Sequence, residues 1–360
     1  KNNHQSSNAY VSPTPPSVGQ RYVEVSLDFE VKTIKDLFKV MNKYPNDPAI
    51  LYNISIHSLH KIRPALEKLD NMIGMNKLKQ SVVEQLLYYL QGFHRVGDNH
   101  DYMHTCIYGP PGTGKTEIAK ILGEIFSGIG YLSSNRFYKV TRSDLIAGYL
   151  GQTALKTKDV IEKALDGVLF IDEAYSLGSP DKRDSFAKEC IDTLCEAMSF
   201  YKSRLMVIIA GYKDELETNF FAMNPGLSSR FTWRFYTDAY SPNELFAIFK
   251  LIAHQAKWKL YGSETDKKKD TNNDTNTDSI ITLDWFTNHH KQFKYAGRDM
   301  EVLFSKSKIV HSMRTFGHPN KEKSVLTLND LKKGYQRFKE HQSNHKDDEQ
   351  NKDQIPTMYL

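Results

Sequence analysis

Cysteine is scarce in this sequence, with three residues in 360. Cys106, Cys190 and Cys195 stand at spacings that match neither a disulfide framework nor a cysteine-ligated metal site, which favours a reducing compartment such as the cytoplasm. Long apolar runs are missing as well: none reaches the roughly 18 residues of a membrane-spanning helix, and no signal-peptide pattern opens the chain. We therefore expect no membrane partner. The sequence opens on Lys1 rather than on methionine, which leaves open whether a targeting segment precedes it.

A strong excess of one charge is also missing. The 48 basic and 43 acidic residues leave a net charge of +5, which is too small to indicate a nucleic-acid partner by itself. Thirteen histidines are scattered without an H-E-x-x-H pattern or another metal-ligand spacing. Hydrophobic residues make up 39% of the chain and charged residues 25%, which is typical of a globular protein with room for two or three structural units.

One stretch carries a specific chemical signal. Gly109-Pro110-Pro111-Gly112-Thr113-Gly114-Lys115-Thr116 fits G-x-x-x-x-G-K-[ST], the phosphate-binding P-loop. An alternating run at 103–108 predicts a strand before it, and residues 117–122 predict a helix after it. Glycines let the backbone wrap an anion, with loop and helix N–H groups facing the phosphates. Lys115 is expected to reach the β- and γ-phosphates and the Thr116 hydroxyl to ligate Mg²⁺, so the chain is predicted to bind a nucleoside triphosphate, ATP.

Expected strands and helices alternate from residue 103 to residue 237. Two of the strands, at 168–171 and 206–210, are apolar on both faces, as buried parallel strands are. Such an alternation predicts an α/β fold, in which helices cover a parallel sheet. The five expected strands are Met103–Gly109, Phe137–Thr141, Gly167–Asp172, Leu205–Gly211 and Phe231–Tyr236.

Composition and periodicity divide the rest of the chain. The expected regions are a disordered start at 1–20, a small N-terminal α+β region at 21–64, an α/β nucleotide-binding domain at 65–240, a helical lid at 241–340 with a disordered insertion at 263–279, and a charged, mobile tail at 341–360. In the α+β region, alternation from Val23 to Val31 predicts a half-buried strand. The lid is expected to hold helices at 244–260, 283–293, 298–313 and 328–338.

Two carboxylates follow the buried strand at 168–171. Asp172 and Glu173 come at its C-terminal end, where open α/β sheets bind their ligands. Adjacent carboxylates repel each other without a cation, so a metal explains the pair better than an exposed acidic turn does. We predict that Asp172 plays the Walker B role of holding Mg²⁺ through a water, and that Glu173 polarises the attacking water.

The order of these motifs resembles that of AAA+ ATPases, and the residues resemble the CbxX/CfqX (CbbX-like) family. The resemblance covers about residues 66–314. It is carried by the P-loop and by DLIAGYLGQTA at 144–154, GVLFIDEAYSL at 167–177, AGY at 210–212 and NPGLSSRF at 224–231. It implies a P-loop core with a helical lid, Mg²⁺-dependent hydrolysis of ATP, and a homo-oligomeric ring, a hexamer.

The resemblance assigns further residue roles. Arg230 matches the arginine finger that one subunit offers to the γ-phosphate of its neighbour, and an always-charged guanidinium suits charge spread over phosphoryl oxygens. Arg298 matches the sensor 2 arginine, which contacts phosphate from the same chain. The sensor 1 position holds Tyr212, as in the CbxX/CfqX branch, whereas most AAA+ proteins have a polar residue there, often asparagine.

Tyr149-Leu150-Gly151 matches the aromatic–hydrophobic–glycine pore loop of AAA+ machines that thread proteins. A tyrosine on a loop flanked by Gly148 and Gly151 could grip an extended polypeptide by non-specific apolar contact, and nucleotide-driven movement of the loop would then pull it. The alternative is a core tyrosine, but the polar Gln152 beside it favours an exposed loop.

These expectations combine into an ATP-dependent ring ATPase that remodels or threads a protein client. A nucleic-acid motor is the first alternative, and it is disfavoured because no basic stripe accompanies the loop at 149–151. A nucleotide-gated scaffold without hydrolysis is the second, and the intact Asp172, Glu173 and Arg230 disfavour it. Neither the client nor the pathway follows from the sequence.

Overall fold

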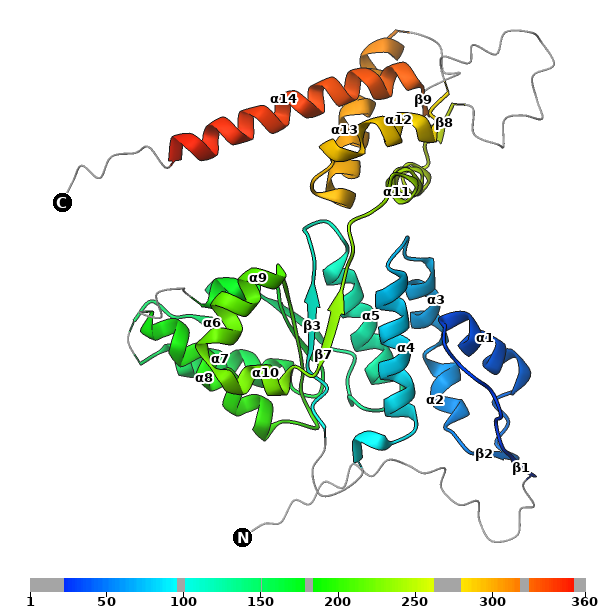
Figure 1. The fold of residues 1–360 in the computed structure, drawn as a ribbon, viewed down its shortest axis with the longest axis vertical. Coiled ribbons are helices and arrows are strands. Elements are labelled where there is room, and N and C mark those ends of the chain that lie inside the picture. The colour runs from blue at the N-terminus through cyan, green and yellow to red at the C-terminus, as the bar shows by residue number, and fades with distance from the viewer. Residues whose placement is uncertain are drawn as a thin grey trace. The chain divides into compact units, whose positions relative to one another are not determined.

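The computed structural model describes residues 23–95, 101–149, 151–178, 184–261, 280–317 and 324–352. These residues form two compact units, whose elements are drawn in Figure 1. The first unit comprises the described residues up to Pro110 and those from Gly114 to Asp238, and the second comprises Pro111–Thr113 and the described residues from Ala239 onward. Leu150 and the two segments expected to be disordered, 1–20 and 263–279, lie outside the described residues.

A five-stranded parallel sheet forms the centre of the first unit. Its strands are β3 Thr105–Tyr108, β4 Phe137–Val140, β5 Val168–Ile171, β6 Met206–Gly211 and β7 Trp233–Tyr236. They lie in the order β4-β5-β6-β3-β7, and every pairing is parallel. Strands β5 and β6 are buried at every residue, because helices cover both faces. The α/β fold and the five strands expected from the sequence are therefore confirmed.

Four long helices cover the two faces of this sheet (Figure 1). Helices α4 Asn76–Leu90 and α5 Lys115–Gly128 lie on one side, and α7 Thr153–Ala164 and α8 Ser185–Phe200 lie on the other. Each turns an apolar stripe at helical spacing toward the sheet. The shorter elements of this part of the chain are the 3₁₀ turn η1 Phe93–Arg95, α6 Arg142–Leu145, the 3₁₀ turn η2 Ala174–Leu177, α9 Lys213–Glu215, the π-helical turn η3 Leu216–Phe220, the 3₁₀ turn η4 Phe221–Met223 and α10 Pro225–Arg230.

The N-terminal region belongs to the same compact unit as the sheet. It consists of β1 Val23–Val25, α1 Ile34–Lys43, β2 Ile50–Tyr52, α2 Ile56–Lys61 and α3 Arg63–Asn71. The strand expected from Val23 to Val31 is wrong in its extent, because β1 ends at Val25. Its only pairing partner in this part of the structure, β2, is equally short. After β1 the backbone bonds to a side chain rather than to a strand: Leu27 N donates to Asn53 Oδ1 at 2.9 Å.

The second unit is mostly helical, as expected. Its elements are α11 Pro242–Gln255, β8 Lys259–Leu260, α12 Leu283–His289, the 3₁₀ turn η6 His290–Gln292, α13 Ala296–Thr315, β9 Val325–Leu326 and α14 Leu328–Lys352. Two expected boundaries are wrong. The helix expected to reach residue 260 ends at Gln255, because Lys257 adopts φ 60° and the chain then pairs with β9. The helix expected at 328–338 runs on as α14 to Lys352, through residues that include lysine, glutamate and glutamine, which are good helix formers.

A buried carboxylate joins α13 to β9 and α14. Asp330 is fully buried and accepts hydrogen bonds from the Arg314 guanidinium at 3.0 Å and from the backbone and hydroxyl of Thr327 at 3.1 and 3.0 Å, while His311 Nδ1 lies 3.2 Å away. Burial raises the pKa of Asp330, but these hydrogen bonds outweigh it and leave the pKa below its ordinary value. Because the folded-state pKa is lowered, the stabilisation is present at neutral pH and is lost as the pH falls through that pKa, below about 4.

We expect Asp330→Asn to destabilise the second unit by about 2 kcal/mol at pH 7, because the Arg314 guanidinium loses a buried counter-charge. Hydrogen exchange of the α13 and α14 amides in the full chain measures this loss. The difference from wild type should shrink as the pH falls below 4. Asp284→Asn, an exposed aspartate on α12, serves as the control and should leave exchange unchanged. Equal protection of wild type and Asp330→Asn at pH 7 would contradict the assignment.

Candidate active site

The carboxyl ends of the parallel strands meet at one edge of the sheet, and the predicted motifs follow them. Gly109 follows β3, Asp172 follows β5, and Tyr212 follows β6. Strand β6 pairs with both β3 and β5, so its end lies between the P-loop and the acidic pair. Gly109 N donates to Gly211 O at 3.1 Å, which fixes the start of the P-loop against this strand. Three motifs that are far apart in the sequence are thus brought to one edge.

The P-loop has the backbone shape of an anion cradle. A Cβ atom at Gly109 would lie 1.7 Å from Thr237 Oγ1, so only glycine fits there. Gly114 has φ 81° and directly precedes α5, which begins at Lys115 and whose first N–H groups have no partner within the helix. Lys115 Nζ donates to the carbonyls of Gly109 and Pro110 at 2.8 Å each. The Lys115 side chain therefore folds back onto the first two residues of the P-loop. Thr116 is the second residue of α5.

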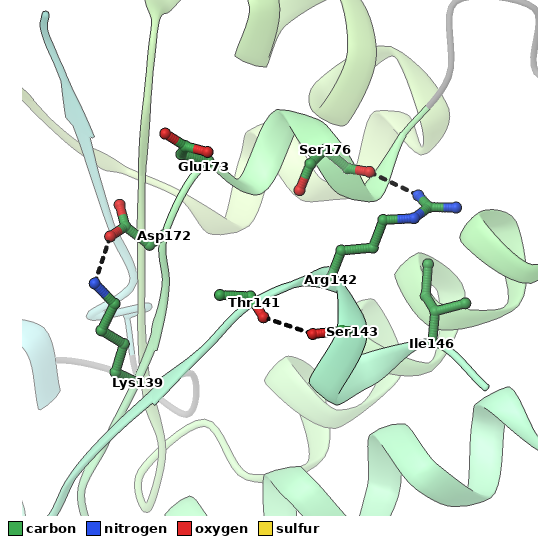
Figure 2. A pocket seen from close by; sticks show the side chains of 8 residues that line it. All are labelled: Lys139, Thr141, Arg142, Ser143, Ile146, Asp172, Glu173 and Ser176. Atoms are coloured by element: carbon green, nitrogen blue, oxygen red, sulfur yellow. Dashed lines mark hydrogen bonds and ion pairs between the residues drawn. The ribbon is translucent and has the colours of Figure 1, made fainter. Parts of the chain in front are cut away.

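The acidic pair lies beside a hollow of about 640 Å³ at the end of β5 (Figure 2). Glu173 adopts φ 51°, a left-handed conformation that is costly for a residue other than glycine and that is typical of functional sites. It turns the chain from β5 into η2 and leaves the Glu173 side chain exposed. Asp172 accepts a hydrogen bond from Lys139 at 2.6 Å. The hollow is lined by Lys139, Thr141, Arg142, Ser143, Ile146, Asp172, Glu173 and Ser176.

The donor set fits a Mg²⁺ ion bound through few protein ligands. Within the described parts of the chain, no three or more His, Cys, Asp or Glu side chains form a group that could hold a metal. Mg²⁺ sites in nucleotide-binding proteins need only one or two such ligands, because phosphates and waters complete the shell. The Asp172 carboxylate pairs with one cation, the Lys139 ammonium, and its role as a metal ligand stays a prediction. The sequence did not predict that Lys139 contacts Asp172. The one signal for it was a single lysine in a strand whose other residues are aromatic or apolar.

Two tyrosines flank the acidic pair. The Tyr212 ring lies 6.1 Å from that of Tyr175, measured between centroids. Burial, helped by the negative charge of Glu173, raises the pKa of Tyr175 to about 12. Tyr175 therefore stays protonated at neutral pH and can donate a hydrogen bond. The sequence predicted that Tyr212 follows the strand now seen as β6, but it indicated no role for Tyr175. The sensor 1 role of Tyr212 stays a prediction.

The Arg230 guanidinium is held by its own chain. Its Nε and Nη2 donate to Ser199 Oγ at 2.9 and 2.8 Å, and its Nη1 donates to Gly226 O at 2.6 Å. The ring of Tyr102 lies 5.7 Å from the guanidinium carbon. Among the described residues, these partners include no member of the P-loop or of the acidic pair. Ser199 at the end of α8 carried no sequence signal, because this contact joins segments 31 residues apart.

Tyr149 lies on a loop whose base is anchored, and Tyr149 itself is exposed to solvent. Lys156 Nζ donates to the carbonyls of Ser143 and Ile146 at 2.6 and 2.9 Å, so α7 holds the end of α6. The Tyr149 side chain is 74% exposed, which is incompatible with the alternative of a core tyrosine. Gly151 has φ 77° and open space around it. Leu150, the middle residue of the predicted motif, lies outside the described residues.

Arg298 is exposed in the first turn of α13, in the second compact unit. Its backbone N–H donates to Tyr295 O at 3.0 Å. Its approach to a phosphate on the P-loop stays a prediction.

The site and the fold together define a P-loop ATPase of the AAA class. The P-loop follows β3, the two carboxylates follow β5, and the strands lie in the order β4-β5-β6-β3-β7. The pattern of the ATPase family associated with various cellular activities (AAA) matches residues 105–238. Within this class the chain belongs to the CbxX/CfqX family, whose members are also named CfxQ.

No helix in the parts of the chain that the structure describes is long and apolar enough to cross a membrane.

Two relatives carry the family assignment. The putative cfxQ-like protein R730 of Acanthamoeba polyphaga mimivirus is 39% identical over 79% of this chain and 67% of its own length. The CfxQ homolog of Galdieria sulphuraria is 33% identical over 75% of this chain and 85% of its own. Among solved structures, the AAA domain of FIGL-1 in complex with ADP has a TM-score of 0.51 and 18% identity, covering 74% of this chain and 83% of that one. At this identity the likeness concerns the fold alone.

Proposed function

We propose that this chain is a Mg²⁺-dependent ATPase that works as a homo-oligomeric ring, a hexamer, and that uses ATP hydrolysis to remodel or thread a protein client. Membership of the AAA ATPases supplies the hydrolysis. The observation that supports a protein client is Tyr149, an aromatic residue that is 74% exposed on a loop anchored at its base. An exposed ring on a loop is suited to non-specific apolar contact with an extended polypeptide.

The residues at the sheet edge divide the chemistry among them. Lys115 would move from the carbonyls of Gly109 and Pro110 onto the β- and γ-phosphates. Thr116 and Asp172 would hold Mg²⁺, which when bound neutralises charge on the phosphate oxygens. Glu173 would polarise the attacking water. Arg298 of the same chain and the Arg230 of a neighbouring subunit would stabilise the charge that develops on the transferred phosphoryl group.

A direct contact links the nucleotide edge to the Tyr149 loop. Arg142, the first residue of α6, donates through Nη1 to Ser176 O at 2.6 Å, and its Nη2 also pairs with Asp184. Ser176 belongs to η2, which directly follows Glu173. Helix α6 in turn leads into the loop that carries Tyr149. A shift of the chain around Glu173 on hydrolysis would therefore reach the loop through a charge-assisted hydrogen bond.

We expect Tyr149→Ala to keep basal ATPase activity and to lose its stimulation by an unfolded polypeptide. Reduced, carboxymethylated α-lactalbumin is a suitable probe, because it stays extended and offers no specific motif. Tyr149→Phe is the matched variant: it keeps the apolar ring and should keep the stimulation. Steady-state phosphate release with and without the probe measures both variants.

Two outcomes of this experiment would count against a protein client. Equal stimulation of wild type and Tyr149→Ala would remove Tyr149 from the gripping surface. Stimulation by single- or double-stranded DNA that falls steeply with salt, with none by the polypeptide, would favour the nucleic-acid motor.

A further inference from the structure

Asp172, the carboxylate proposed to hold Mg²⁺, is paired with a lysine that belongs to none of the motifs. Lys139 Nζ lies 2.6 Å from Asp172 Oδ2 (Figure 2). Lys139 stands on β4 opposite Phe170 of β5, and its ammonium lies 5.8 Å from the centre of the Phe170 ring. Strand β4 is at the edge of the sheet. The side chain thus runs along the neighbouring strand and ends on the carboxylate that follows it.

This pair sets two cations in competition for one carboxylate. An ammonium is a compact charge that can satisfy a carboxylate oxygen at close range. A Mg²⁺ ion on the same carboxylate, directly or through a water, would bring a second positive charge into the immediate neighbourhood of the first, and the two would repel each other. Lys139 has room to move away, because its side chain is 46% exposed and lines the hollow of about 640 Å³.

We propose that Lys139 is a built-in counter-cation of Asp172, which competes with Mg²⁺ for this carboxylate and so raises the Mg²⁺ concentration at which the metal–nucleotide complex is held. The inference rests on the proposed role of Asp172. Lys139 balances the carboxylate in the absence of metal and turns into the hollow when metal binds. Its contacts are with the Asp172 carboxylate and the Phe170 ring, so we assign it as a positioning residue that sets the Mg²⁺ concentration at which the site fills.

A structural ion pair is the competing explanation. In that case Lys139 would tie the edge strand β4 to β5 and would affect stability alone. Lys139→Met separates the two, because it removes the charge and keeps a long apolar stem over Phe170, while Lys139→Arg keeps the charge. Arg204→Met is the matched control: Arg204 donates to Asp166 at 2.9 and 2.7 Å, its side chain is 48% exposed, and it lies just before β6, at the amino end of the strands and away from the acidic pair.

The experiment measures metal dependence of binding rather than turnover. A fluorescent, non-hydrolysable ATP analogue is held at a fixed subsaturating concentration with the full chain, and Mg²⁺ is titrated from zero. We expect Lys139→Met to reach half-maximal metal-dependent binding at about two- to fivefold lower Mg²⁺ than wild type, the range set by a partly exposed ion pair. Lys139→Arg should need as much Mg²⁺ as wild type or more, and Arg204→Met should not change the midpoint. Melting temperatures of all variants report the structural contribution separately.

The possible outcomes separate this inference from the proposed function. An unchanged or higher Mg²⁺ midpoint in Lys139→Met overturns the inference, whatever its melting temperature. Weaker binding of the analogue by Lys139→Met in the absence of metal also overturns it, because Lys139 would then be a phosphate ligand. If Asp172→Asn keeps the wild-type metal dependence, the metal role of Asp172 fails and the inference fails with it. If Asp172→Asn weakens that dependence while Lys139→Met leaves it unchanged, only the inference fails. Lys139→Gln replaces Lys139→Met if the latter does not fold.

Discussion

Glu173→Gln is expected to bind ATP with near wild-type affinity and to hydrolyse it about 10²- to 10⁴-fold more slowly, the range of a lost general base. The amide keeps the size and the hydrogen-bonding reach of the carboxylate but cannot take up a proton from water. Glu173 stands in the left-handed region directly after β5, and Gln tolerates this backbone about as well as Glu does. Binding should therefore persist, because the P-loop and Lys115 are untouched.

Single-turnover hydrolysis and equilibrium binding of a fluorescent ATP analogue separate the two effects. Glu196→Gln is the matched control, since Glu196 is an exposed glutamate on α8 in the same unit, and its turnover should equal that of wild type. Normal hydrolysis by Glu173→Gln would remove Glu173 from the role of base. Loss of binding together with hydrolysis would instead mean that the carboxylate helps to form the nucleotide site.

The elements of the site that could be predicted from the sequence share a physical reason. The P-loop glycines and the fully apolar strands β5 and β6 are local signals, because a tight anion turn needs glycine and a strand buried on both faces needs apolar residues at every position. The parallel sheet then brings Gly109, Asp172 and Tyr212 to one edge without further information.

The elements that escaped the sequence depend on a partner elsewhere in the chain. Strand β1 shows strict alternation to Val31 but ends at Val25, because β2 offers only three residues to pair with. The contacts of Lys139 with Asp172 and of Ser199 with Arg230 join segments 33 and 31 residues apart, so no local spacing encodes them. The sequence pattern predicts that Arg230 is an arginine finger, but it does not predict the contacts of Arg230 with Ser199 and Gly226, which only the structure shows.

Arg230→Ala is expected to lower ATP turnover about 10³-fold, the lower range measured for arginine fingers, while ATP binding persists. The described contacts of Arg230 are with Ser199, Gly226 and Tyr102 of its own unit, and none is with the P-loop or the acidic pair, so we expect its proposed phosphate contact in a neighbouring subunit. A guanidinium that releases Ser199 and Gly226 can present all its donors to phosphoryl oxygens, which a lysine ammonium cannot match. Arg230→Lys should accordingly restore little of the lost activity.

Mixing two inactive variants distinguishes a finger that acts in a neighbour from an arginine that merely supports its own fold. Lys115→Ala has an impaired P-loop and an intact finger, and Arg230→Ala has the reverse. In randomly mixed rings at equal amounts, about one quarter of the sites combine an intact P-loop with an intact neighbouring finger. Activity should therefore be near zero for either variant alone and should peak near equal mixing. If Arg230 only stabilised α10 through Ser199 and Gly226, no ratio of the two variants would recover activity, because the defect would stay within each subunit.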